Sequence, residues 1–171
     1  MGTLGIGVGA PLNILCVCTY NQTRSVLMAA LLDEHLRAEG VRADISGAGT
    51  RAAGGAPMST TVDALAARGI DVRSHRGRPI DGPLVDAADL VITLEDHVLM
   101  GGYGSTVLEH FADARIATPV VRIGWPDQFI EHASTVDFLR KKYGLSVENT
   151  VAQAKARFAA PVVEQVEFRA A

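Results

Sequence analysis

The sequence predicts an α/β fold, a doubly wound, four-stranded parallel sheet with helices on both faces. Two observations favour it. Short apolar segments alternate with segments of helical periodicity, as in a parallel sheet whose strands are joined by crossover helices. The first apolar segment has no polar face, which is typical of a central strand covered by helices on both sides. The expected strands span residues 13–18, 42–46, 90–93 and 120–123.

Helical patterns occupy the connections between these strands. The first begins at Arg24 and runs to Glu39, where Gly40 provides a C-cap. The glycines that follow the second strand indicate close approach of the backbone to a neighbouring segment rather than a helix. Further helices are expected at residues 58–68, 83–88, 95–100, 103–112, 130–143 and 147–159.

The length of 171 residues suits one domain. We expect this α/β domain to span residues 12–160, after a flexible glycine-rich leader (1–11) and before a frayed tail (161–171). The leader lacks Lys and Arg ahead of its weakly apolar residues, so it is a poor signal peptide. A net charge of −3 with scattered basic residues gives no indication of a nucleic-acid partner. No apolar run is long enough for a membrane segment.

The chain has two cysteines, Cys16 and Cys18. They lie too close along one strand for an unstrained disulfide, so no disulfide framework is available. This favours a reducing compartment, and we expect a cytoplasmic protein. Cys16 fits an ordinary core position.

The candidate functional side chains are concentrated in the loop after the first strand. This loop reads Cys18-Thr19-Tyr20-Asn21-Gln22-Thr23-Arg24-Ser25. Backbone N–H groups of such a loop, together with the start of the next helix, can surround an oxyanion, and Arg24 offers a two-pronged fork for its oxygens. The same positive field favours the thiolate form of Cys18. One loop can therefore bind an anion and attack it.

These residues resemble the low-molecular-weight protein tyrosine phosphatase family, which shares its fold with thioredoxin-coupled arsenate reductases. The family loop reads Cys-x-Gly-Asn-x-Cys-Arg-Ser, and four further family segments have counterparts in the same order. The resemblance extends from Asn13 to Phe129. The counterparts are Gly47-Ala48-Gly49-Thr50, His75-Arg76-Gly77-Arg78, Ala88-Asp89-Leu90-Val91 and Asp127-Gln128-Phe129.

The resemblance implies a two-step phosphatase reaction. Cys18 would attack phosphorus and form a cysteinyl-phosphate, while Asp127 protonates the leaving oxygen and later helps water to cleave the intermediate. Arg24 and the loop amides would stabilise the charge on the equatorial oxygens. No metal and no cofactor would be needed.

The resemblance also implies binding and support roles around the catalytic residues. Asn21, Ser25 and His75 would hold the loop in shape, with His75 in a structural role. The partners implied are a phosphorylated protein or a small phosphomonoester, and oxyanions such as phosphate, vanadate and arsenate. The residues expected to line the substrate are Thr19, Tyr20, Asn21, Gln22, Thr23, Ser25 and Phe129.

Several positions depart from the family pattern. Tyr20 replaces a glycine, so it must point outward or the loop must differ locally. Thr23 replaces the second loop cysteine. Gly47 replaces a supporting serine, whose place could be taken by Ser46 or water. Residues 130–171 differ from the single final helix of the family.

Two alternatives remain open on these grounds. An arsenate reductase would need an external small thiol, because the chain has no cysteine beyond Cys18. A turnover-deficient oxyanion-binding module is the other, since both the rim of the loop and its support are altered. A protein phosphotyrosine phosphatase is the interpretation that the motifs favour.

Overall fold

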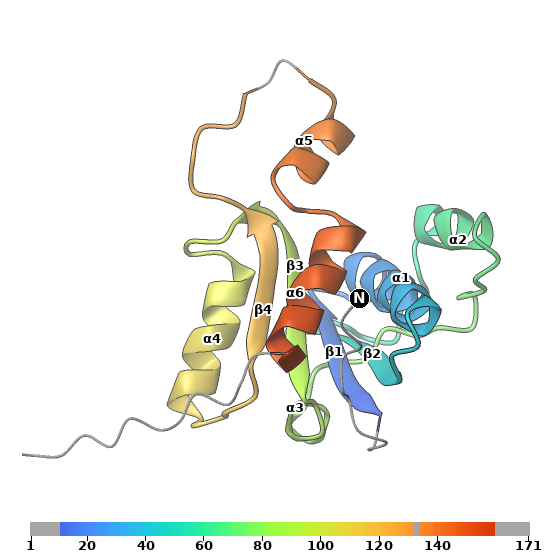
Figure 1. Cartoon of the computed structure of the whole chain (residues 1–171). Coiled ribbons are helices and arrows are strands. Elements are labelled where there is room, and N and C mark those ends of the chain that lie inside the picture. The colour runs from blue at the N-terminus through green and yellow to red at the C-terminus, as the bar shows by residue number, and fades with distance from the viewer. Residues whose placement is uncertain (1–10, 132–133, 160–171) are drawn as a thin grey trace, which may run out of the picture.

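A computed structural model describes residues 11–131 and 134–159 of the chain. It contains a four-stranded sheet in the order β2-β1-β3-β4, in which every neighbouring pair is parallel (Figure 1). The predicted fold class is therefore confirmed. The expected leader, apart from Pro11, and the expected tail lie outside the described residues. The strands are β1 (Leu12–Cys18), β2 (Ala43–Gly49), β3 (Leu90–Val98) and β4 (Val120–Trp125).

Helices α1 (Arg24–Ala38) and α6 (Val147–Ala159) cover one face of the sheet. The core on this face joins side chains of both helices to alternate residues of β1, β3 and β4, which gives the first strand its second apolar face. Cys16 is fully buried there, as expected of a core cysteine. The helical side chains of this layer are Met28, Leu32, Leu36, Val151 and Ala154.

Helices α3 (Gly82–Asp86) and α4 (Tyr103–Asp113) cover the opposite face. Leu15 and Val17 of β1 point into this second core, together with Val107 and Phe111 of α4. Since β1 is buried on both faces and paired on both edges, its carboxyl end is held firmly. This is the end from which the cysteine loop leaves the sheet.

The two remaining helices lie outside these layers. Helix α2 (Ser59–Ala66) lies beside α1, and Arg68 just after it donates two hydrogen bonds to Glu34. Helix α5 (Val136–Lys142) follows the segment that rises from the end of β4 (Figure 1). None of the helices described is long and apolar enough to cross a bilayer.

The structure corrects two of the expected elements. Residues 95–98 continue β3 instead of beginning a helix, because the strand bulges after Leu94 and Val98 then pairs with Trp125. In the segment expected as one helix over 130–143, only Val136–Lys142 is helical among the described residues. The longer β3 carries two carboxylates, Glu95 and Asp96, to the carboxyl edge of the sheet.

Candidate active site

The cysteine loop, residues 18–25, curls at the carboxyl end of β1 with its carbonyl groups turned outward. Four of these carbonyls accept hydrogen bonds from the surrounding segments. The backbone N–H groups of the loop, those of Tyr20, Asn21 and Ser25 among them, are left to face the concavity around the Cys18 sulfur. This is the geometry of an anion-binding nest. The distances are 3.2 Å for Thr50 N to Cys18 O, 2.7 Å for Arg51 N to Thr19 O, 2.9 Å for His75 Nε2 to Asn21 O and 3.1 Å for Met58 N to Gln22 O.

The Cys18 thiol is 5% exposed and is surrounded by hydrogen-bond donors. Its Sγ lies 3.1 Å from Ser25 Oγ and accepts the backbone N–H of Asn21 at 3.3 Å. Burial raises the pKa of Cys18, but the hydroxyl of Ser25 and the backbone N–H groups of Ser25, Asn21 and Tyr20 lower it further than burial raises it. The result is a pKa below the ordinary value for a thiol, as a nucleophilic thiolate requires.

Burial has the opposite result at Cys16. Burial raises the pKa of the Cys16 thiol far above its ordinary range, and the negative charge of Cys18 adds to the rise. Cys16 and Cys18 therefore differ in reactivity, because the Cys16 thiol faces the core whereas the Cys18 thiol faces the N–H groups of the loop.

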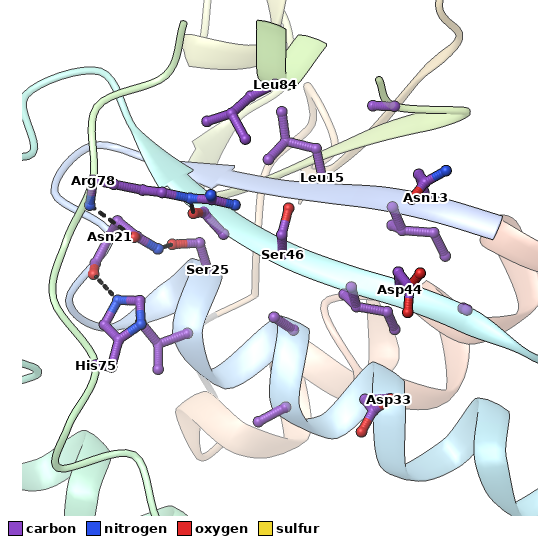
Figure 2. A pocket seen from close by; sticks show the side chains of 18 of the residues that line it. Asn13, Leu15, Asn21, Ser25, Asp33, Asp44, Ser46, His75, Arg78 and Leu84 are labelled. Atoms are coloured by element: carbon purple, nitrogen blue, oxygen red, sulfur yellow. Dashed lines mark hydrogen bonds between the residues drawn. The ribbon is translucent and has the colours of Figure 1, made fainter. Parts of the chain in front are cut away.

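Asn21 holds the loop together from behind. Its φ of 52° places it in the left-handed region, which asparagine tolerates better than other residues that have a side chain. Its Nδ2 donates to Ser25 Oγ at 2.8 Å, so the hydroxyl hydrogen of Ser25 remains available to Cys18. Its Oδ1 accepts the backbone N–H of Arg78 at 3.2 Å (Figure 2). The structure thus brings together Asn21, Ser25 and His75, the expected supporting residues.

The Arg78 side chain binds the backbone at Gly47, the position that lacks the supporting hydroxyl. Its Nε donates to the Gly47 carbonyl oxygen at 2.9 Å, which ties the 75–78 turn to β2 (Figure 2). A Cβ at position 47 would lie 2.6 Å from Asn21 Nδ2, so the position of this amide leaves no room for a serine. Ser46 makes no side-chain hydrogen bond within the part of the chain described. Ser46 therefore does not supply the missing hydrogen bond, and Arg78 adds two contacts of its own to the support.

A hollow of about 680 Å³ opens behind this network, between α1, β2 and the 72–78 turn (Figure 2). Asn21, Ser25 and Arg78 line it, but Cys18 does not. It therefore adjoins the back of the loop, away from the sulfur that would meet a substrate.

Glycines at two positions let the neighbouring segments press against the loop. A Cβ at Gly49 would lie 2.7 Å from the Thr19 carbonyl oxygen and 2.8 Å from Asn21 N. A Cβ at Gly77 would lie 2.7 Å from the Tyr20 carbonyl oxygen. The close approach expected from the glycines after the second strand is confirmed, and its partner is the cysteine loop.

The rim of the loop is formed by Tyr20, Gln22, Thr23 and Arg24. Tyr20 is 51% exposed and has no positive φ, so its side chain turns outward while Asn21 takes the left-handed position. The Thr23 side chain does not cap α1, which leaves the N-terminal N–H groups of this helix available to an anion. Arg24 is exposed and makes no hydrogen bond or ion pair with any described residue. Its guanidinium is therefore available to a ligand.

Asp127 and Phe129 lie on the separate segment that follows β4. Asp127 is exposed and makes no hydrogen bond or ion pair with the described residues, and Phe129 is 82% exposed. The general-acid role expected for Asp127 therefore stays a prediction. The carboxyl ends of parallel strands lie at one edge of a sheet, so this segment leaves the sheet at the same edge as the cysteine loop.

Tyr103 is a residue near the site that sequence reasoning missed. Its hydroxyl is buried near Thr50 without a partner in normal hydrogen-bond geometry. Burial raises the pKa of Tyr103 to about 12, and the negative charges of Cys18 and Glu95 raise it as well, against a lowering by Thr50. Tyr103 consequently stays protonated at neutral pH. No motif in the sequence distinguishes this tyrosine from a core residue.

Comparison with known families places both the cysteine loop and the 75–78 turn within the match to one family. Residues 13–101, just over half of the chain, match the sequence model of the low molecular weight phosphotyrosine protein phosphatases. The chain belongs to this phosphatase family. The match ends before β4, so it includes the cysteine loop and the 75–78 turn but not Asp127 or Phe129.

Solved structures show the same phosphatase fold. A YwlE mutant from Bacillus subtilis superimposes with a TM-score of 0.61 at 22% identity, over 84% of this chain and 99% of that one. A low molecular weight protein tyrosine phosphatase from T. tengcongensis gives a TM-score of 0.59 at 19% identity, over 83% of this chain and 99% of that one. The YwlE arginine phosphatase from Geobacillus stearothermophilus gives 0.56 at 21% identity, over 85% and 94%. The fold thus continues beyond the part of the sequence that matches the family.

Residues 58–150 also match a second sequence model, that of the transketolase C-terminal domain. Curated relatives of part of the chain are 1-deoxy-D-xylulose-5-phosphate synthases. The one from Methylacidiphilum infernorum is 57% identical over 67 residues, which are 39% of this chain and 10% of that protein. The one from Acidobacterium capsulatum is 55% identical over 75 residues, or 42% and 12%. The chain spans about a tenth of the length of these relatives. The two family matches overlap over residues 58–101.

The start of α4 packs against a buried carboxylate that sequence reasoning missed. Glu95 is 3% exposed, and its Oε1 accepts the N–H of Gly104 at 3.1 Å. A Cβ at Gly102 would lie 2.2 Å from the other oxygen of this carboxylate. Glu95 within β3 and the Gly101-Gly102-Tyr103-Gly104 run at the start of α4 thus pack together. A parallel strand–helix–strand unit of this kind can extend any parallel sheet whose edge strand it matches.

The hydrogen bond from Ser25 to the Cys18 thiolate can be tested by alkylation. Only the thiolate reacts with iodoacetamide, and Cys16 is buried, so the rate against pH reports the pKa of Cys18. Ser25→Ala removes a donor that lowers this pKa, so we expect the alkylation curve to move to higher pH. Ser46→Ala serves as the control and leaves the curve in place. An unchanged curve in Ser25→Ala would show that Ser25 does not stabilise the thiolate.

Among residues 11–131 and 134–159, no three His, Cys, Asp or Glu side chains gather where they could hold a metal ion.

Proposed function

We propose that this protein is a phosphomonoester phosphatase that acts through a cysteinyl-phosphate intermediate. One observation carries the proposal, the Cys18 sulfur with a lowered pKa inside a ring of N–H donors at the start of α1. This arrangement provides a nucleophile and an oxyanion site at the same point. The family match of the loop supports the same chemistry.

In the first step, the Cys18 thiolate attacks phosphorus in line with the ester oxygen. The S–P bond forms while the P–O bond breaks, and Asp127 in its protonated form gives its proton to the leaving oxygen. In the second step, Asp127 as a carboxylate takes a proton from water, whose oxygen displaces the sulfur and releases phosphate. Arg24 and the loop N–H groups stabilise the equatorial oxygens in both steps.

We infer that aryl phosphates, and phosphotyrosine in proteins among them, are the preferred substrates. Tyr20 and Phe129 present exposed aromatic rings, one on the rim of the loop and the other on the segment after β4. Aromatic side chains favour a flat ring in the substrate. Phosphate and vanadate are expected to bind in the same loop. A thiolate nucleophile functions only in a reducing compartment, which supports a cytoplasmic location.

Rapid-quench kinetics with 4-nitrophenyl phosphate test the proposal. We expect a phosphoenzyme that forms in amounts stoichiometric with the enzyme and decays as phosphate is released, together with competitive inhibition by vanadate. Tight vanadate binding without turnover of any phosphomonoester would contradict the proposal and favour the oxyanion-binding module. Oxidation of a small thiol that depends on arsenate would instead favour the arsenate reductase.

A further inference from the structure

Asp96 lies between the two parts of the site. It is placed near the carboxyl end of β3, and β3 separates β1 from β4 in the sheet. The cysteine loop leaves the sheet from β1, and the segment with Asp127 leaves it from β4. A side chain at this end of β3 is therefore positioned to act on both.

The carboxylate of Asp96 joins the two ends of the segment that carries Asp127. Its Oδ1 accepts the indole N–H of Trp125, the last residue of β4, at 2.7 Å. Its Oδ2 accepts Nη2 of Arg140 in α5, also at 2.7 Å. Trp125 directly precedes Pro126 and Asp127, so this carboxylate holds the residue from which they leave the sheet.

Trp125 is fixed by additional contacts. Its carbonyl oxygen accepts the N–H of Leu99 at 2.9 Å, and its ring lies 6.0 Å from that of Tyr143. Removing Asp96 would release the indole and Arg140, while the backbone pairing of β4 would remain. The expected effect is therefore on the position of the segment and not on the sheet.

The charges around Asp96 favour its ionised form. Burial raises the pKa of Asp96, but the hydrogen bonds from Trp125 and Arg140 and the positive charges of Arg140 and Arg24 lower it more. An ionised carboxylate at neutral pH cannot supply the proton for a leaving group. It is instead suited to holding donors and cations in place.

We propose that Asp96 is a positioning residue that, by holding Trp125, fixes the start of the segment after β4, and with it Asp127, at the edge of the sheet where the cysteine loop lies. This role rests on the proposed phosphatase function. Trp125 and Arg140 lie beyond residue 101, where the phosphatase match ends, and within the transketolase match. Both partners of Asp96 therefore lie outside the residues that match the phosphatase sequence model.

Asp96→Ala tests this role through two esters that differ in the leaving group. Phenyl phosphate needs a proton on its leaving oxygen, whereas 4-nitrophenyl phosphate releases a stable anion and depends little on a general acid. We expect kcat/KM for phenyl phosphate to fall about 10- to 100-fold, and that for the nitrophenyl ester to change less than about two-fold. Asp137→Ala is the matched control, because this exposed carboxylate lies 3.9 Å from Arg140 Nη1 and has little to hold.

Fluorescence provides a readout that does not depend on activity. Trp125 is the only tryptophan of the chain, so the emission reports on this residue alone. Loss of the Asp96 hydrogen bond is expected to shift the emission maximum to longer wavelength in Asp96→Ala but not in Asp137→Ala.

The outcomes separate the two proposals. A wild-type chain that hydrolyses neither ester contradicts the phosphatase function, and the positioning role with it. In an active enzyme, an unchanged phenyl phosphate rate or an unchanged emission maximum contradicts the positioning role alone. Equal losses with both esters also contradict it, because they would place the effect on phosphate binding by Arg24.

Discussion

Cys18→Ser is expected to abolish the hydrolysis of aryl phosphates, with kcat falling on the order of 10⁵-fold. The serine hydroxyl stays protonated at neutral pH, whereas the surroundings of Cys18 lower the pKa of the thiol and favour its anion. The loop N–H groups remain, so the variant should still bind inorganic phosphate. Steady-state rates and calorimetric titration with phosphate measure the two properties separately.

Cys16→Ala is the control for this substitution. Cys16 is fully buried in the core under α1 and α6, so its loss lowers stability slightly without touching the loop. The variant should therefore keep its activity at a temperature where it is folded. Substantial turnover by Cys18→Ser, in a protein that still binds phosphate, would exclude the covalent mechanism.

Arg24→Lys is expected to lower kcat/KM for 4-nitrophenyl phosphate about 10³-fold. Lysine retains the positive charge but loses the planar fork that donates two parallel hydrogen bonds to phosphate oxygens. Arg24 is exposed and unpaired among the described residues, so the melting temperature should not change. Kinetics and thermal unfolding check the two halves of this prediction.

Arg68→Lys controls for the general effect of exchanging arginine for lysine. Arg68 pairs with Glu34 on the surface beside α1 and α2, far along the chain from the loop. Its replacement is expected to leave the rate unchanged. A rate for Arg24→Lys close to that of the wild type would show that a point charge is sufficient and that the fork has no role.

The cysteine loop was predictable because its parts are local in the chain. A buried strand, a helix start, and a cysteine and arginine with five residues between them are contained in one short segment. The parallel sheet followed from the alternation of apolar and helical segments. The strand over 95–98 was missed because its pairing with Trp125 depends on a bulge, which periodicity does not register.

The match to the transketolase C-terminal domain was not predicted for a related reason. From β3 onward the chain has the strand–helix–strand order of a parallel sheet. It therefore fits the phosphatase pattern whatever its family. The departure of residues 130–171 from a single final helix was the available signal. The role carried over to Asp127 lies in this second part and stays a prediction.

The sequence by itself predicted the parallel sheet and the cysteine loop, and its family resemblance indicated that Asn21, Ser25 and His75 would lie together. Only the tertiary structure placed Arg78 on Gly47, across 31 residues of chain, and Asp96 on Trp125 and Arg140, across 29 and 44. Local periodicity determines which residues face the core, but polar contacts between distant segments depend on how the strands and turns pack. The support behind the loop and the link to the Asp127 segment are therefore properties of the folded chain.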